Sequence, residues 1–297
     1  MAGRRFRRRR LVGYAFVAPV FLFLCAIIVF PLGHAFWTSL QRVRGLRSTF
    51  VGAANYVHVL TDDTFWHSLW LSFAYTSVSV ALHMLLGLAL ALLLDELKSA
   101  RTALRIAFLS PWMVAPAVGA TIWLWLLEPQ FGVVNYLLRA AGLIDAPQAW
   151  LGEPLKAFAS VVAVDVWRGV PFVMLLMLAG LQTVPAEQHE AASLDGAGRI
   201  RAFWWCIFPI MKPVVATIVV LNSISVWNDF VSPQIILGPS SGIYTVTTGV
   251  YAAVGEFSTD YTTVFPTLLL AVTPAILFFV LMQRHIIGGL VAGATKG

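Results

Sequence analysis

Residues 190–209 read EAASLDGAGRIRAFWWCIFP, and this short polar segment lies between two long apolar stretches. Polar segments are scarce in this chain, because 59% of its 297 residues are hydrophobic and only 11% are charged. Soluble domains carry about 25% charged residues. We therefore expect the segment to have a function, and its small side chains suit contact with another protein.

The remainder of the chain consists of long apolar blocks, and its mean hydropathy is +0.81. A helix needs about 20 apolar residues to cross the hydrocarbon core of a bilayer. A transmembrane β-barrel would instead show segments of about 10 residues that alternate in polarity. We therefore predict an all-α polytopic membrane protein with six transmembrane helices. The predicted spans are Leu11–Leu32, Ser68–Leu94, Leu104–Leu127, Ala157–Leu181, Val214–Leu237 and Thr263–Met282.

The distribution of basic residues predicts the orientation in the membrane. If the N-terminus is cytoplasmic, the inner segments contain 14 of the 20 Lys and Arg residues, six of them within residues 1–10. Loops rich in Lys and Arg stay on the cytoplasmic side. We therefore expect both termini in the cytoplasm. The net charge of +6 follows this asymmetry, so we do not interpret it as nucleic-acid binding.

The spans and loops predict the organisation of the chain. We expect a basic cytoplasmic N-terminus (1–10), a first helix with an outer loop (11–65), a five-helix core (66–283) that contains a cytoplasmic loop (182–213), and a cytoplasmic tail (284–297). Residues 128–144 have apolar positions at helical spacing, which predicts a short helix on the outer surface. The two cysteines lie in a span and in the cytoplasmic loop, so they cannot pair.

The cytoplasmic loop contains a predicted helix at residues 185–194. Proline suits the first turn of a helix, and Asp195 followed by Gly196 favours its end. Ala191 and Ala192 provide a small-residue patch that allows another backbone to approach closely. The alternative is an amphipathic helix that rests on lipid. Such helices usually combine basic and bulky apolar residues, so we favour docking to a protein.

This loop resembles the cytoplasmic signature of binding-protein-dependent ABC importer permeases, in which EAA is followed after three residues by Gly and thirteen residues later by Pro. The matching residues are Glu190, Ala191, Ala192, Gly196 and Pro209. Cys206 and Phe208 stand where the family usually has Ile and Leu. Other segments resemble the carbohydrate branch of this family, of the maltose and glycerol-3-phosphate type. They include FVGAANYVHVL (50–60), DVWRGVPFVMLLMLAGLQTVP (165–185) and GGLVAGATKG (288–297).

The resemblance implies a type I ABC importer permease fold in a bacterial or archaeal inner membrane. The loop helix would be a coupling helix, with Asp195 beside the signature residues, set into a cytoplasmic ATPase dimer that binds ATP and Mg. A second permease, usually a different chain, and an extracytoplasmic solute-binding protein would complete the importer. The solute would be a sugar or a related polyol or glycerol-phosphate compound. The chain has no Gly-x-x-x-x-Gly-Lys-Ser/Thr motif for ATP, and we do not expect it to be an enzyme.

Polar residues within the spans are candidates for the substrate pathway, because an ionisable side chain near the bilayer centre costs about 2.5–3.5 kcal/mol. The predicted pathway residues are Asp165, Trp167, Asn222, Ser225, Asn228 and Asp229. Helical rise places Asp165 and Asp229 at similar depths, where both acids can face one cavity. Asn222, Ser225 and Asp229 have the spacing of one helical face. Either Trp227 or Trp167 nearby can stack on a sugar ring.

Other interpretations of these residues stay open. Asp165 and Arg168 have the spacing of a self-neutralising pair, and Asn222 with Ser225 can form interhelical hydrogen bonds. We interpret His83 as a packed or hydrogen-bonded residue rather than a ligand, and we see no cluster with metal-ligand spacing. An alternative function is a secondary transporter driven by an ion gradient. A membrane-embedded enzyme would need a convergent acid, base or metal set, which the sequence does not offer.

Overall fold

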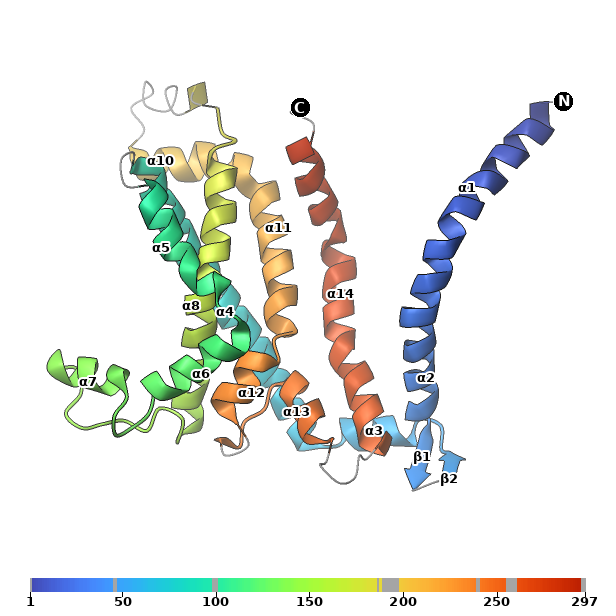
Figure 1. Cartoon of the computed structure of the whole chain (residues 1–297), viewed down its shortest axis with the longest axis horizontal. Helices are drawn as coiled ribbons and strands as arrows, with labels where there is room; N and C mark the ends of the chain where they lie inside the picture. Colours follow the sequence, from blue (N-terminus) through green and yellow to red (C-terminus); the bar gives the residue numbers. More distant parts are fainter. Residues whose placement is uncertain are drawn as a thin grey trace. The chain divides into compact units, whose positions relative to one another are not determined.

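A computed structural model describes residues 2–44, 47–97, 101–185, 187–188, 198–238, 241–254 and 261–294. The side chains of residues 2–12, 44, 101, 199 and 284–294 are not included in this description. Within the described ranges, five helices are long and apolar enough to cross a membrane, and a bent helix pair gives a sixth crossing if its two halves form one span. The described structure is almost entirely helical (Figure 1).

The chain divides into two compact units, residues 1–65 with 250–270, and residues 66–249 with 271–297. The first unit contains α1 (Ala2–Leu24), a π-helical turn (Cys25–Val29), α2 (Phe30–Ser39), β1 (Gln41–Arg44), β2 (Arg47–Phe50) and α3 (Ala54–Leu60). Its apolar span, Gly13–Ser39, includes most of the predicted first span. Asn55 anchors the antiparallel hairpin, because its Nδ2 donates to the carbonyl oxygens of Ser39 (2.8 Å) and Gln41 (2.9 Å).

The second unit contains most of the remaining helices. These are α4 (Asp63–Glu96), α5 (Arg101–Met113), α6 (Pro116–Leu126), α7 (Val133–Ala140), α8 (Pro154–Leu181), α10 (Arg199–Ala202), the π-helical turn η2 (Phe203–Ile207), α11 (Phe208–Trp227) and α12 (Val231–Leu237). Two further helices, α13 (Val246–Ala252) and α14 (Tyr261–Ala294), follow. The predicted spans at 68–94 and 157–181 lie within α4 and α8. The predicted short helix at 128–144 is confirmed as α7.

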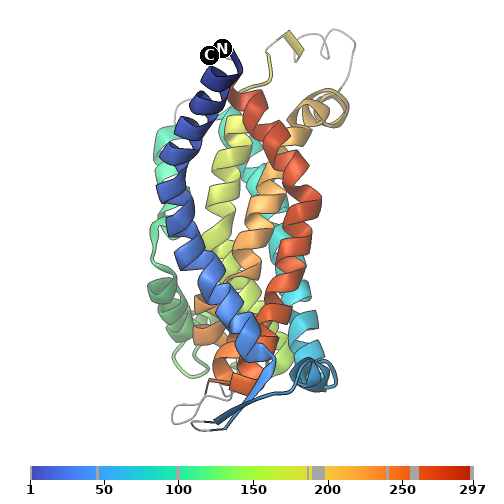
Figure 2. The ribbon, with the colours of Figure 1, turned by 90° about the vertical axis from the view of Figure 1, so that its right-hand side faces the viewer.

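Helix α8 contacts α5, α11 and α12 in the second unit. Helix α4 also packs against it (Figure 2). Two glycines allow α4 and α8 to approach closely. A Cβ atom on Gly87 would lie 2.7 Å from Val173 Cγ1, and one on Gly169 would lie 2.4 Å from the His83 ring. Small residues at such crossings bring transmembrane backbones together. The close approach places the polar side chains of α4 within reach of α8.

The predicted third span, Leu104–Leu127, is not a straight helix. It consists of α5 and α6, which meet at an angle of 94° across a break at residues 114–115. Ala115 has an extended backbone (φ −56°, ψ 136°) and precedes Pro116. Proline disfavours the helical conformation in the residue before it. The bend therefore follows from the sequence at this position.

The predicted fifth span, Val214–Leu237, is wrong at its C-terminal end. Helix α11 ends at Trp227, and residues 228–230 separate it from α12. Polar side chains bind the backbone on both sides of this break. Asn228 Nδ2 donates to the Ile224 carbonyl (2.8 Å), and Asp229 Oδ1 accepts from the Ser232 N–H (3.4 Å). Asn and Asp often compete with the helix in this way.

Candidate functional site

A network of polar side chains lies between α4, α8 and the end of α11 in the second unit. Its members come from three transmembrane segments and from the break after α11. The network consists of Tyr75, His83, Asp165, Arg168, Asn222 and Asp229. Tyr75, His83 and Asp165 are at most 2% exposed. Burial at this level is costly unless the groups satisfy one another.

Arg168 joins the two acids of this buried network. Its Nη2 lies 3.8 Å from Asp165 Oδ1 and 3.6 Å from Asp229 Oδ2. The two carboxylates that we expected at similar depth are thus brought together through one guanidinium group. Pairing between Asp165 and Arg168, one of the two interpretations left open by the sequence, is present and extends to Asp229. Each carboxylate is thereby stabilised by a nearby positive charge.

His83 connects the network to α4. Its Nε2 lies 3.1 Å from the Asp165 carbonyl oxygen and 3.5 Å from Asp165 Oδ2. Its Nδ1 lies 3.0 Å from Asn222 Nδ2. A neutral imidazole with its proton on Nε2 satisfies both hydrogen bonds, because it donates to the carbonyl and accepts from the amide. The interpretation of His83 as a hydrogen-bonded residue is confirmed. Of the two interpretations left open for Asn222, the interhelical hydrogen bond is present.

Asp229 is contacted by four residues. Its Oδ2 accepts a hydrogen bond from Tyr75 OH (3.3 Å) in addition to its contact with Arg168. Its carbonyl oxygen accepts from Thr247 Oγ1 (3.1 Å) at the start of α13, and its Oδ1 accepts from the Ser232 N–H. The break after α11 is therefore fixed both to the buried network and to α13.

The sequence predictions missed Tyr75 and Thr247. A signal for Tyr75 was present, because Tyr75, Ser79 and His83 recur every four residues and form one buried polar face of α4. That spacing places side chains on the same side of a helix. Thr247 gave no such signal, since its contact with Asp229 joins residues 18 apart across an irregular segment.

The other predicted pathway residues do not share this network. Ser225 and Asn228 are exposed, while Asn222 is buried, so α11 presents two different polar faces. The expected single stripe of Asn222, Ser225 and Asp229 is wrong, because Asp229 lies beyond the end of the helix. Trp167 is half-buried and packs edge-on against Trp123, with their ring centroids 5.8 Å apart.

A groove of about 450 Å³ lies elsewhere in the second unit, between α4, α11 and α14. Its walls are mainly apolar and include Trp227, which packs edge-on against Phe73 with ring centroids 4.9 Å apart. Thr76, Ser77 and Ser223 add hydroxyl groups to the lining. The residues of the buried charged network do not line it.

The predicted coupling residues fall almost entirely outside the described part of the chain. These are Glu190, Ala191, Ala192, Asp195 and Gly196. Pro209 is described and lies in the first turn of α11, where proline is well tolerated. Loop 182–213 therefore leads directly into the helix that carries Asn222, Ser225 and the break at Asp229.

Comparison with known proteins identifies the family. Residues 11–290 match the family described as "Binding-protein-dependent transport system inner membrane component". The trehalose/maltose transport system permease protein MalF of Thermococcus litoralis is 35% identical over 237 residues, which cover 79% of this chain and 80% of that protein. The sn-glycerol-3-phosphate transport system permease protein UgpA of Agrobacterium fabrum is 32% identical over 222 residues, 74% of this chain and 75% of that protein.

A solved structure has the same fold. A chain of the bacterial alginate ABC transporter, in complex with an alginate pentasaccharide-bound periplasmic protein, aligns with a TM-score of 0.78 at 18% identity, over 94% of this chain and 95% of that one. The fold is thus that of a type I ABC importer permease. The chain belongs to the family of inner membrane components of binding-protein-dependent transport systems.

Family membership defines the general role of the chain. It is a multi-pass inner-membrane permease subunit of an ABC importer. In this family the ATPase is a separate subunit, so the chain is a transport subunit and not an enzyme. The expectations drawn from the cytoplasmic loop and from the carbohydrate-type segments are confirmed at this level.

Proposed function

We propose that this permease imports a sugar, or a related polyol or glycerol-phosphate compound, by alternating access. The names of the trehalose/maltose and glycerol-3-phosphate permeases support this substrate class. We further propose that the working importer contains a second, different permease, a cytoplasmic ATPase dimer that binds ATP and Mg, and an extracytoplasmic solute-binding protein. The periplasmic protein bound in the alginate transporter supports the last of these partners.

The exposed polar face of α11 is the observation that carries this proposal. Ser225 lies near the C-terminal end of α11 and Asn228 directly follows that helix, and both side chains are exposed. Polar side chains in a transmembrane segment face a protein interior or a water-filled cavity rather than lipid. We therefore assign these two residues to a translocation path beside a second permease. Both are neutral hydrogen-bonding groups, which suits a hydroxyl-rich solute.

The buried network has a supporting role in this proposal. Asp165, Asn222 and Asp229 lie behind the exposed face of α11 and fix the shape of the path near its break. Backbone that departs from a helix within a membrane must be buried in protein or line a cavity. Trp167, half-buried on α8, offers an aromatic surface on which a sugar ring can stack.

The coupling step of the proposal involves loop 182–213. The helix with Glu190, Ala191 and Ala192 would seat in the ATPase dimer, and Asp195 with Gly196 would end it. Closure of the ATPase dimer would move this helix, and the movement would enter the membrane through Pro209 at the start of α11. The path would then open outward to accept the solute and reopen inward after hydrolysis.

Transport by purified components tests the proposal. The chain would be reconstituted in liposomes with its ATPase, its sister permease and its binding protein. Uptake of labelled trehalose, maltose and glycerol-3-phosphate would be measured with and without internal ATP. ATP-dependent uptake of one of these solutes is expected. Replacing Glu190 or Gly196 should lower uptake at least tenfold while ATP hydrolysis continues.

The alternative function, a secondary transporter, predicts the opposite result in such liposomes. A secondary transporter would accumulate the solute with this chain alone under a proton or sodium gradient. Accumulation under those conditions would exclude the ATP-driven mechanism. Uptake of none of the three solutes by an assembled, ATP-hydrolysing complex would exclude the proposed substrate class.

A further inference from the structure

The helical stretch that contains α11 is longer than a membrane span requires. Residues 200–227 form one apolar helical stretch of 28 residues. At about 1.5 Å per residue a straight helix of this length would extend for about 42 Å, whereas the hydrocarbon core is about 30 Å thick. Helix α11 alone, with 20 residues, is long enough to cross the core. The preceding nine residues, 199–207, are therefore available for another purpose, and we call them the interfacial segment.

The interfacial segment lies crosswise to α11. Figure 1 shows α10 running across the end of the helices α8 and α11, and Figure 2 shows the same segment almost end-on. One of its faces packs against the second unit, because Phe203 and Ile207 are at most 8% exposed and belong to the apolar core there. This packing determines which side chains of the segment are left exposed.

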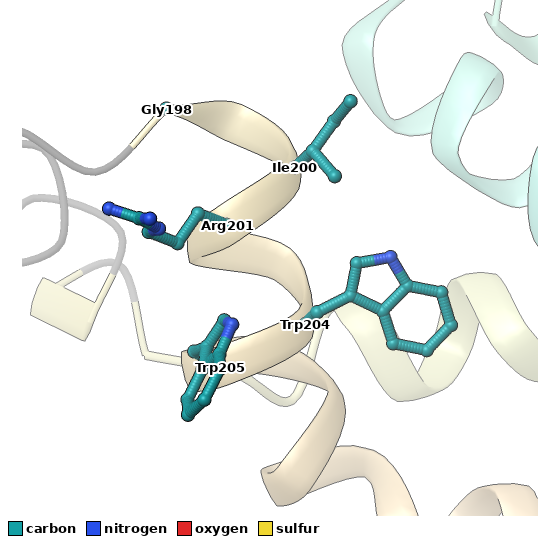
Figure 3. Close-up of a pocket in the computed structure, with 5 residues that line it drawn as sticks. All are labelled: Gly198, Ile200, Arg201, Trp204 and Trp205. Atoms are coloured by element: carbon teal, nitrogen blue, oxygen red, sulfur yellow. The ribbon is translucent and has the colours of Figure 1, made fainter.

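The free faces carry large apolar side chains and a cation. Ile200, Trp204 and Trp205 are 78%, 52% and 79% exposed. Figure 3 shows Ile200 and Trp204 on one side of the helix, and Arg201 with Trp205 on the other. These residues and Gly198 line an open hollow of about 780 Å³. Each exposed aromatic side chain leaves a large apolar area that favours a less polar environment than water.

The charged residues of the interfacial segment and of α11 are all basic. Residues 196–228 contain no Asp or Glu, whereas Arg199, Arg201 and Lys212 are basic. Tryptophan is enriched where the hydrocarbon core meets the headgroups, and basic residues there attract anionic lipids. Exposed tryptophans beside basic residues are therefore more typical of a lipid interface than of a docking site for an ATPase.

We propose that the interfacial segment binds an anionic phospholipid, with Arg201 at the lipid phosphate and with Trp204, Trp205 and Ile200 against the glycerol region and upper acyl chain. The bound lipid fixes the N-terminal end of α11 at the membrane surface, at the point where loop 182–213 enters the span. The inference concerns this chain and its lipid and does not depend on the identity of the transported solute.

Tryptophan quenching in nanodiscs tests the location of the segment. The full-length chain is placed in phosphatidylcholine nanodiscs containing lipids brominated either near the headgroup or near the chain end. The contribution of Trp205 to the fluorescence is the difference in emission between the wild type and Trp205→Phe. We expect bromines near the headgroup to quench it at least twofold more strongly than deep bromines. Trp125→Phe, which removes a tryptophan of 69% exposure on α6, is the matched control for the subtraction.

A phosphatidylglycerol titration tests the recognition of charge. The Trp205 emission is followed as phosphatidylglycerol replaces phosphatidylcholine. One basic residue near an anionic surface contributes about 1 kcal/mol, which corresponds to about a fivefold change in binding. Arg201→Gln should therefore raise the midpoint mole fraction about fivefold. Arg201→Lys should leave it unchanged, as should Arg139→Gln on α7.

Three outcomes would overturn the proposal. The first is a Trp205 signal that neither set of bromines quenches. The second is an unchanged midpoint in Arg201→Gln. The third is quenching that appears only after co-purified ATPase has been removed, which would assign the surface to that protein instead. Shallow quenching together with the shifted midpoint supports the lipid site.

Discussion

At the residue scale, Arg168 controls the electrostatics of the buried network. It is the guanidinium within 4 Å of both Asp165 and Asp229, and its own side chain is 24% exposed. A carboxylate without a partner in a low-dielectric interior is strongly destabilising. The ion pairs of Arg168 therefore contribute more to the stability of the fold than ion pairs on the protein surface would.

Removal of Arg168 should destabilise the protein. Arg168→Gln leaves two carboxylates without their shared cation, and we expect a loss of about 3 kcal/mol, the low end for a buried ion pair because the arginine is partly exposed. Thermal unfolding of the purified protein in detergent measures the change. The double variant Arg168→Gln/Asp229→Asn removes one of the two charges and should recover part of the loss. Equal instability of the single and double variants would contradict the proposed pairing.

Gly169 should be intolerant of a methyl group. A Cβ atom there would lie 2.4 Å from His83 Cε1 and Nε2, within a crossing of two packed helices. We expect Gly169→Ala to cost about 1–3 kcal/mol by overpacking. Gly33→Ala on α2 is the control, because a Cβ atom there would have no neighbour within 4 Å and alanine favours helices. His83→Ala combined with Gly169→Ala should relieve the clash. A stable single variant would show that the crossing is looser than described.

At the element scale, the two faces of α11 distinguish structural from pathway residues. Asn222 binds His83, whereas Ser225 and Asn228 are exposed. If the exposed face lines a water-filled path, cysteines there will ionise and react with polar reagents. A lipid-facing cysteine stays protonated and reacts slowly.

Thiol accessibility tests this assignment. In a Cys25→Ser/Cys206→Ser background, Ser225→Cys and Asn228→Cys should react with a charged methanethiosulfonate at least tenfold faster than Leu85→Cys, a control on α4 that is 65% exposed. The rates would be measured in the assembled transporter in membranes. Equal rates at all three positions would remove the path from this face of α11.

The order and approximate position of most spans could be predicted from the sequence, because the predicted spans at 68–94 and 157–181 are mainly apolar and lie within α4 and α8. The bend at Ala115 could also have been predicted from the neighbouring Pro116, although hydropathy alone gives no sign of it. The end of α11 at Trp227 was harder to predict. It depends on Asp229, whose partners Tyr75, Arg168 and Thr247 come from three other segments. Spacing within one helix cannot reveal such contacts.

At the scale of the whole molecule, orientation in the membrane stays a prediction of the basic residues. Cys206 lies in the interfacial segment and is half-buried, and Cys25 lies in the first apolar span. In a Cys25→Ser variant, a membrane-impermeant thiol reagent should label Cys206 in inside-out vesicles and not in intact cells. Labelling at least tenfold greater in inside-out vesicles is expected. Labelling of intact cells would reverse the predicted topology.

The shared guanidinium has a consequence for how the permease moves. Asp165 and Arg168 both lie on α8, so separating α8 from the junction after α11 by a few ångströms would leave the Asp229 carboxylate buried without this cation. The cost of several kcal/mol opposes sliding between the two segments. We therefore expect these segments to move together during the transport cycle. The break between α5 and α6 at residues 114–115 is where we expect the bundle to bend instead.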